Sequence, residues 1–163
     1  MSANTEFYSN DHFKEWMDIQ STPRSALLIE DSVNETNLIV HMSKDFRIKW
    51  DIAHNGESAL RMIATKGRYQ LVILDLILGT HPDGVDLFRD IKKICPTCPV
   101  LVLSGHISND IILRITNIGF AMFAQKPNVF DSDFFEQLFM VLGIPKIVPV
   151  PEPQKTTECG EHI

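Results

Sequence analysis

The sequence has few cysteines, no long hydrophobic run and no excess of basic residues, and each absence excludes a class of protein. No run of about 18 apolar residues occurs, so a membrane-spanning helix is not expected. Residues 1–10 are polar and lack the basic and then apolar layout of a signal peptide. The 3 cysteines are an odd, sparse set, unlike the disulfide framework of a secreted domain. We therefore expect a cytoplasmic protein.

The chain is acidic rather than basic. Lys and Arg number 15 and Asp and Glu number 21, which gives a formal net charge of -6 with neutral His. This balance disfavours a general nucleic-acid-binding surface, which needs many cations to face the phosphates. The 163 residues, 44% of them hydrophobic, are enough for one domain with its own core. We expect one domain with terminal extensions, and neither a nucleic-acid nor a membrane partner.

The two ends of the chain differ in composition from its middle. Residues 1–24 are mostly polar, but a helix over residues 11–20 would place their apolar side chains on one stripe: Phe13, Trp16, Met17 and Ile19. Residues 144–163 combine several prolines with a polar end, a composition that buries too little surface to fold. We predict an N-terminal extension over 1–24 with a short helix, a folded domain over 25–143 and a flexible tail over 144–163.

Between these ends, short apolar runs alternate with amphipathic segments. We expect strands at residues 26–29, 48–53, 71–74, 100–103 and 121–125. We expect helices at residues 34–44, 57–66, 85–94, 109–117 and 132–142. Continuous apolar runs are typical of strands that are covered on both faces. The repeated strand-then-helix order predicts an α/β fold with a doubly wound, five-stranded parallel sheet.

Polar residues follow all of the expected strands except the second. They are Glu30 and Asp31 after the first strand, Asp75 after the third, Ser104 and Gly105 after the fourth, and Lys126 after the fifth. In an open parallel sheet, ligands bind beyond the carboxyl ends of the strands, so we expect these side chains to converge. Two carboxylates 4 Å apart repel by about 4 kcal/mol at an effective dielectric near 20, which a divalent cation relieves. Oxygen-only ligands favour Mg²⁺, while a lysine and a hydroxyl are suited to hold a phosphoryl group nearby.

These motifs together resemble the response-regulator receiver family of two-component signalling. The segments that carry the resemblance are Leu-Leu-Ile-Glu-Asp at 27–31, Leu-Val-Ile-Leu-Asp-Leu at 71–76, Leu-Val-Leu-Ser-Gly at 101–105 and Lys-Pro at 126–127. Phe123 stands three residues before the lysine, where the family has its switch aromatic. The resemblance covers residues 25–142 and implies the flavodoxin-like (βα)5 fold with strand order 2-1-3-4-5.

The resemblance also implies a role for each site residue. Asp75 would be the phosphoacceptor, with Lys126 and Ser104 acting on the phosphoryl group and Ile77 and Gly105 beside it. Mg²⁺ would be bound directly by Asp31 and Asp75, through water by Glu30, and by the backbone carbonyl of Ile77. Ser104 and Phe123 would move on phosphorylation and form the switch.

As implied by the resemblance, the protein is a stand-alone receiver in a phosphorelay and not an enzyme acting on a separate substrate. A histidine kinase or a phosphotransfer protein would supply the phosphoryl group, and a downstream partner protein would receive the signal. A homodimer could form through the face made by residues 109–117, 121–125 and 132–142. The helix at 109–117 carries more apolar residues than one buried face needs, so it is either a partner surface or a deeply buried helix.

Two other functions stay open from the sequence. The loop at residues 76–84 is one residue longer than the family pattern, which keeps open a degenerate receiver that acts as a phosphorylation-independent scaffold. A Mg²⁺-dependent aspartyl phosphatase or phosphotransferase usually has a second acid two residues after its nucleophile, and Ile77 stands there. Cys95 and Cys98 have the spacing of a redox pair, but they lie in a loop before a strand rather than at a helix start, so we interpret them as neither a redox nor a metal site.

Overall fold

The computed structural model describes residues 22–79, 83–126 and 132–147. The strands are β1 (Arg24–Ile29), β2 (Ile48–Ala53), β3 (Leu71–Asp75), β4 (Val100–Ser104) and β5 (Met122–Gln125). The helices in the described residues are α2 (Val33–Met42), α3 (Gly56–Lys66), α4 (Gly84–Ile94), α5 (Asn109–Thr116) and α6 (Ser132–Val141). Strands and helices alternate along the chain as the apolar pattern predicts, with bounds that differ by only one or two residues. None of these helices is both long enough and apolar enough to cross a membrane.

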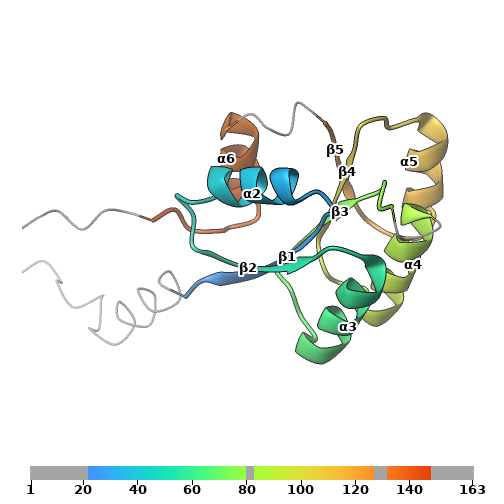
Figure 1. Cartoon of the computed structure of the whole chain (residues 1–163), viewed down its shortest axis with the longest axis horizontal. Coiled ribbons are helices and arrows are strands. Elements are labelled where there is room, and N and C mark those ends of the chain that lie inside the picture. The colour runs from blue at the N-terminus through green and yellow to red at the C-terminus, as the bar shows by residue number, and fades with distance from the viewer. Residues whose placement is uncertain (1–21, 80–82, 127–131, 148–163) are drawn as a thin grey trace, which may run out of the picture.

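The strands form one parallel sheet in the order β2-β1-β3-β4-β5. Helices α2 and α6 lie on one face of the sheet, and α3, α4 and α5 lie on the other (Figure 1). The predicted doubly wound, flavodoxin-like fold is therefore confirmed. The strand order reverses between β1 and β3, and a ligand site is expected where the carboxyl ends of these two strands meet.

The core has two layers because the sheet is covered on both faces. Alternate strand residues point into the layer under α3, α4 and α5: Leu27, Ile29, Val72, Leu74, Val100 and Val102. The residues between them point into the layer under α2 and α6: Ala26, Leu28, Leu71, Ile73, Leu101 and Leu103. All of β3 and β4 is buried, which explains why their sequences are continuous apolar runs rather than alternating ones. This packing holds the strand ends, and therefore the site, in fixed positions.

Side-chain caps start the helices that follow the strands. Ser32, Asn55, Asp83 and Ser108 each accept a backbone N–H in the first turn of their helices. At the start of α4, Gly84 packs so closely that an added Cβ would lie 2.4 Å from the carbonyl oxygen of Leu76. Only glycine permits this approach, so Gly84 holds α4 against the segment that leaves β3.

The predicted boundary of the C-terminal tail is wrong for its first residues. Ile144 is buried in the layer under α6, and Lys146 forms an antiparallel bridge with Phe46. The backbone N–H of Arg47 donates to the carbonyl of Pro145 at 2.9 Å. Proline lacks an N–H but keeps its acceptor, so a proline-rich segment can still pair at a sheet edge. Residues 148–163 and the predicted helix at 11–20 lie outside the described residues.

Candidate functional site

Lys126 lies at the centre of a group of carboxylates at the carboxyl end of the sheet. Its Nζ donates to Glu30 Oε2 at 2.8 Å, to Asp75 Oδ2 at 3.0 Å and to the carboxylate of Glu35. The backbone N–H of Lys126 donates to the carbonyl of Ser104 at 2.9 Å, which continues the pairing of β5 with β4. The structure thus brings together the ends of four strands, as the sequence pattern predicts.

Burial makes this group electrostatically unusual. Glu30 is 1% exposed and Asp75 is 5% exposed, and carboxylate oxygens of Glu30, Glu35 and Asp75 all lie within 4.8 Å of one another. Burial raises the pKa of Glu30, although hydrogen bonds from Lys126 and from the Ser32 N–H oppose this effect. Burial alone would lower the pKa of Lys126, but its three carboxylate partners outweigh burial and raise that pKa. Three carboxylates face one ammonium, so the site attracts further positive charge.

Glu35 belongs to the site although it lies outside the strand-end pattern that predicts the other site residues. Ser32 and Glu35 have the spacing of a capping box, in which the carboxylate accepts the N–H of the capping residue. Here Glu30 Oε1 accepts the Ser32 N–H at 3.0 Å, while Ser32 Oγ accepts the Glu35 N–H at 3.3 Å. The Glu35 carboxylate is therefore available to Lys126. Its position in the first helical turn after the acidic pair is the signal that could have identified it.

The other acidic residue of the pair, Asp31, faces the loop after β3. Its Oδ2 accepts the N–H of Gly79 at 2.9 Å, and Asp75 Oδ1 accepts the N–H of Ile77 at 3.0 Å. A Cβ on Gly79 would lie 3.3 Å from Asp31 Oδ2, so glycine allows this close approach. The structure places Asp31 and Ile77 at the same edge of the sheet as Asp75. The metal-binding roles of Asp31 and of the Ile77 carbonyl stay predictions.

The predicted switch residues lie next to the site in one defined arrangement. The hydroxyl of the buried Ser104 donates to the carbonyl of His106 at 2.8 Å, which is a hydrogen bond within the loop that follows β4. Gly105 is exposed, and its carbonyl accepts a hydrogen bond from Gln125 Nε2 at 3.3 Å. Phe123 is partly buried and packs against the layer under α3, α4 and α5. Their roles in phosphate binding and switching stay predictions.

The donors at this edge fit a divalent cation by their chemistry. Glu30, Glu35 and Asp75 offer only oxygen atoms, which Mg²⁺ prefers, and Mg²⁺ needs few protein carboxylates because it keeps several waters. Lys126 neutralises part of this charge in the structure. The group is therefore a candidate metal site that already contains one protein cation.

Comparison with known proteins assigns this sequence to a family. The model of the response regulator receiver domain family matches residues 26–133. The chain belongs to this family. An NtrX-like response regulator of Rickettsia bellii is 32% identical over 109 residues, which are 66% of this chain and 22% of the relative. The nitrogen assimilation regulatory protein NtrX of Azorhizobium caulinodans is 30% identical over 108 residues, which are 66% of this chain and 23% of that protein.

A solved structure agrees with the sequence matches. The receiver domain of NtrX from Brucella abortus is 28% identical, with a TM-score of 0.62 over 72% of this chain and 96% of that chain. The receiver domain described here thus spans less than a quarter of the length of the curated relatives that it matches. The similarity covers a receiver domain and leaves out most of each relative.

Proposed function

We propose that this receiver domain accepts a phosphoryl group on Asp75 and passes the signal on by protein contact in a phosphorelay. The observation that carries the proposal is the Asp75 carboxylate, which ends β3, is buried, and lies 3.0 Å from the Lys126 ammonium. A histidine kinase or a phosphotransfer protein is the proposed donor. The protein would be cytoplasmic and would not turn over a separate substrate.

The reaction needs positioning more than acid–base chemistry. An oxygen of ionised Asp75 attacks the phosphorus of a phosphohistidine, the O–P bond forms, and the N–P bond breaks with its electron pair returning to the imidazole. Because the nucleophile is already a carboxylate, no general base is required. Lys126 holds one oxygen of this carboxylate while the N–H of Ile77 holds the other, so the chain fixes the orientation of the nucleophile.

We include Mg²⁺ in the proposal because the donors fit it. Glu30, Asp31 and Asp75, with the carbonyl of Ile77, would hold the ion. When bound, the ion supplies positive charge that offsets the phosphoryl oxygens. Lys126 contributes charge of the same sign from the β5 side of the site.

The signal would leave the site through Ser104 and Phe123. To reach a phosphoryl oxygen, the Ser104 hydroxyl must give up the His106 carbonyl, and Phe123 would turn inward. The face formed by α5, β5 and α6 would then repack and bind a downstream protein or a second copy of the chain. Large apolar side chains are exposed on α5, on the segment before β5 and on α6: Leu113, Phe120, Met140 and Val141. Ile115 is fully buried, so the helix serves both the core and the surface.

Intact-protein mass after incubation with acetyl phosphate tests the proposal. Wild type with Mg²⁺ should gain one phosphoryl group, and both Asp75→Asn and an EDTA sample should gain none. Asp86→Asn, an exposed acidic change in α4, is the matched control and should behave as wild type. Absence of a gain together with failure to bind beryllofluoride would favour the scaffold function. Continuous release of phosphate in large excess over protein would favour the aspartyl phosphatase.

A further inference from the structure

Cys95 and Cys98 form a disulfide where α4 ends and β4 approaches. Cys95 is the C-terminal cap of α4, and its N–H donates to the carbonyl of Ile91 at 2.8 Å. The N–H of Cys98 donates to the Cys95 carbonyl at 3.3 Å, and β4 begins two residues later at Val100. The bond therefore ties the last turn of α4 to the amino end of the strand that carries Ser104. The sequence spacing did not predict this bond.

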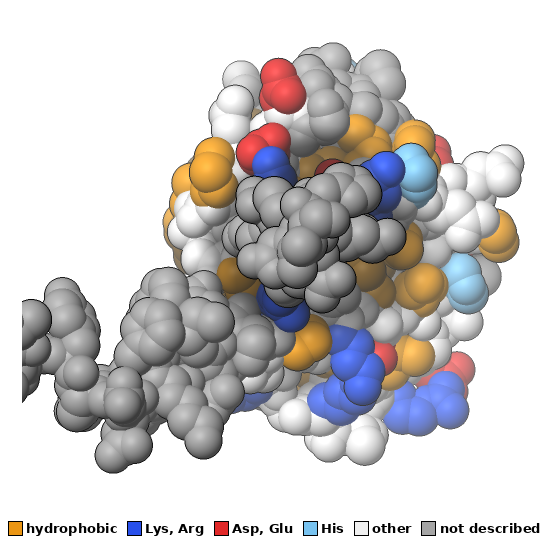
Figure 2. All heavy atoms as spheres, turned by 90° about the vertical axis from the view of Figure 1, so that its left-hand side faces the viewer, with side chains coloured by type: hydrophobic (Ala, Val, Ile, Leu, Met, Phe, Trp, Pro, Cys, Tyr) orange, Lys and Arg blue, Asp and Glu red, His pale blue; other side chains and the backbone are white. Residues whose placement is uncertain are grey.

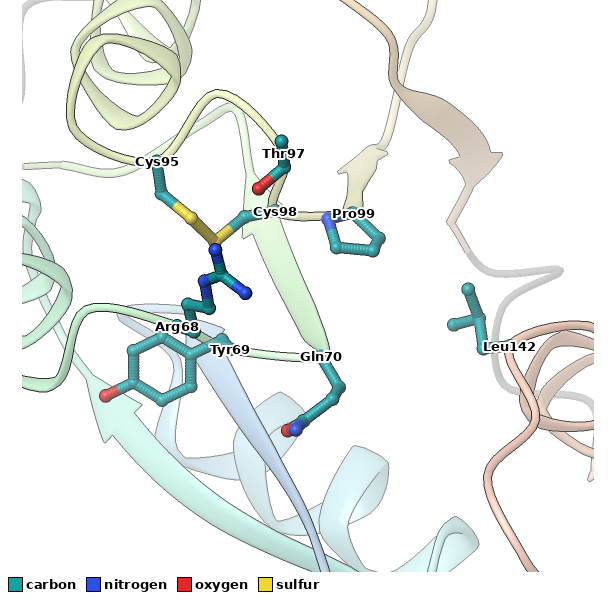
Figure 3. Close-up of a pocket in the computed structure, with 8 residues that line it drawn as sticks. All are labelled: Arg68, Tyr69, Gln70, Cys95, Thr97, Cys98, Pro99 and Leu142. Atoms are coloured by element: carbon teal, nitrogen blue, oxygen red, sulfur yellow. A yellow bond between two sulfur atoms is a disulfide. The ribbon is translucent and has the colours of Figure 1, made fainter.

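The disulfide lies in the wall of a pocket. Both cysteines line a cavity of about 350 Å³ between the segments that precede β3 and β4 (Figure 3). Cys95 is 4% exposed and Cys98 is 3% exposed, so a large protein surface has little access to them. A small reagent would approach the bond from the cavity that both residues line.

The surroundings of the disulfide are cationic. Arg68 lines the same cavity, and Figure 3 shows its guanidinium directed toward the disulfide. No acidic residue is among the residues that line the cavity, and Arg68 has no carboxylate partner within the described residues. Elsewhere on the surface, Lys and Arg side chains lie beside Asp and Glu side chains in the lower part of the face seen in Figure 2. Positive charge near a sulfur favours the thiolate over the thiol.

A second cation lies behind the disulfide. The buried Lys92 donates from Nζ to the carbonyl of Cys98 at 2.8 Å, and burial lowers the pKa of this lysine. A Cβ on Gly119 would lie 3.7 Å from carbons of the Lys92 side chain, so this side chain also lies beside the segment between α5 and β5. Lys92 thus lies between the disulfide loop and the segment that joins α5 to β5.

We propose that Cys95 and Cys98 are a thiol–disulfide exchange site for small anionic thiols of the glutathione class. The thiolate of one small molecule attacks a cysteine sulfur, the disulfide breaks, and the other cysteine leaves as a thiolate. A second thiol then attacks the mixed disulfide. The products are two cysteine thiols, which receive the protons of the two small thiols, and one small-molecule disulfide. This site is separate from Asp75 and does not depend on phosphorylation.

The site also accounts for a disulfide in a protein for which we propose a cytoplasmic location. Disulfides in that compartment are mostly transient and take part in redox chemistry. A bond that closes and opens with the thiol pool meets this condition, whereas a permanent structural bond does not.

The first test is a redox titration of the full chain. The protein is equilibrated at different ratios of reduced to oxidised glutathione, quenched with an alkylating agent, and analysed by peptide mass. Alkylation of Cys95 and Cys98 should rise together as the reduced share increases, while the third cysteine, Cys159, shows the behaviour of a single thiol in the same sample. A pair that stays fully bonded, or fully reduced, over the whole range overturns the proposal.

The second test addresses the charge of the reagent. Arg68→Gln should slow reduction by glutathione by up to about fivefold, the size expected for one exposed charge pair. Reduction by the neutral thiol 2-mercaptoethanol should be unchanged. Arg61→Gln, which removes an exposed charge of α3 that is absent from the cavity wall, is the matched control. No slowing, or equal slowing with both thiols, would overturn the assignment to anionic thiols.

Discussion

The two ends of the parallel sheet are held together by different forces. At the carboxyl end, Lys126 joins Glu30, Glu35 and Asp75 through charge and hydrogen bonds. At the amino end, the disulfide between Cys95 and Cys98 joins the end of α4 to the segment that leads into β4. A network of charges can exchange one cation for another, whereas a disulfide opens to two thiols only when a reductant supplies two electrons. The two ends should therefore respond to different chemical signals.

Two buried lysines show the same contrast. Lys126 and Lys92 are both largely removed from water, and burial by itself lowers the pKa of each. Lys126 faces three carboxylates, so its pKa is raised, whereas Lys92 donates to the carbonyl of Cys98, and its pKa is lowered. Burial sets the direction of the pKa shift for Lys92, whereas three carboxylate partners reverse it for Lys126.

The largest expected effect comes from removing the cation at the carboxyl end. Lys126→Met leaves Glu30 and Asp75 as buried carboxylates without their counter-ion, which should lower the free energy of unfolding by about 3–5 kcal/mol. Urea unfolding at neutral pH measures this loss. Added Mg²⁺ should restore more stability to Lys126→Met than to wild type. Lys93→Met, which breaks an exposed pair with Asp90, should change stability by at most about 0.5 kcal/mol. Equal losses for the two variants would show that the buried network is not special.

The close contact at the start of α4 should give the next largest effect. Gly84→Ala places a methyl group against the backbone of Leu76 and should cost about 1–3 kcal/mol of stability, measured by thermal unfolding. Gly119→Ala meets only ordinary contacts at 3.7 Å and is the control. If both glycines tolerate alanine equally, the loop after β3 is not held by this contact.

Opening the disulfide should cost less because the loop that it closes is short. Reduction is expected to lower the free energy of unfolding by at most about 2 kcal/mol. Since the two ends share no partner among the residues that the structure describes, the effects of reduction and of Mg²⁺ should add to within about 0.5 kcal/mol. Urea unfolding in the four combinations of reductant and Mg²⁺ measures this. A larger deviation would show that the two ends are coupled.

The smallest effect concerns the charge of the α4 cap. The hydrogen bond from Arg114, aided by the Val85 N–H and the nearby Arg89, lowers the pKa of Asp83. The resulting stability is present above the ordinary Asp pKa of about 3.9 and is lost as pH falls through the lower folded pKa. Asp83→Asn should therefore be less stable than wild type at neutral pH, by a margin that shrinks on acidification. Thermal unfolding against pH tests this, and high salt should reduce the margin as well. A constant margin would assign the effect to the cap geometry.

The fold and most of the site follow from sequence pattern for a simple reason. Strands that are buried on both faces must be apolar throughout, so the residue where polarity resumes marks the strand end. Glu30 and Asp75 mark such ends, whereas Lys126 follows the partly buried β5, which already ends in the exposed Gln125. The meeting of the three residues follows from the parallel direction of the strands. The positions of the apolar runs thus predict both the strands of the sheet and the edge of the sheet that carries the site.

What the pattern missed are contacts that depend on choices between partners. Glu35 could have completed a capping box, but Glu30 satisfies that N–H first. The spacing of Cys95 and Cys98 is compatible with a disulfide or with a metal site, and it does not decide between them. Ile144 is buried against the domain, and the carbonyl of the next residue, Pro145, accepts the N–H of Arg47. Amino-acid composition alone does not predict such a contact.

The loop that follows Asp75 is fixed at both ends. Gly79 is held by Asp31, and Gly84 is pressed against Leu76. The cost of closing a loop rises only slowly with its length, so residues inserted between such anchors hardly disturb what lies outside them. The loop at residues 76–84 is one residue longer than the family pattern, and its contacts at Gly79 and Gly84 leave Asp75 at the end of β3.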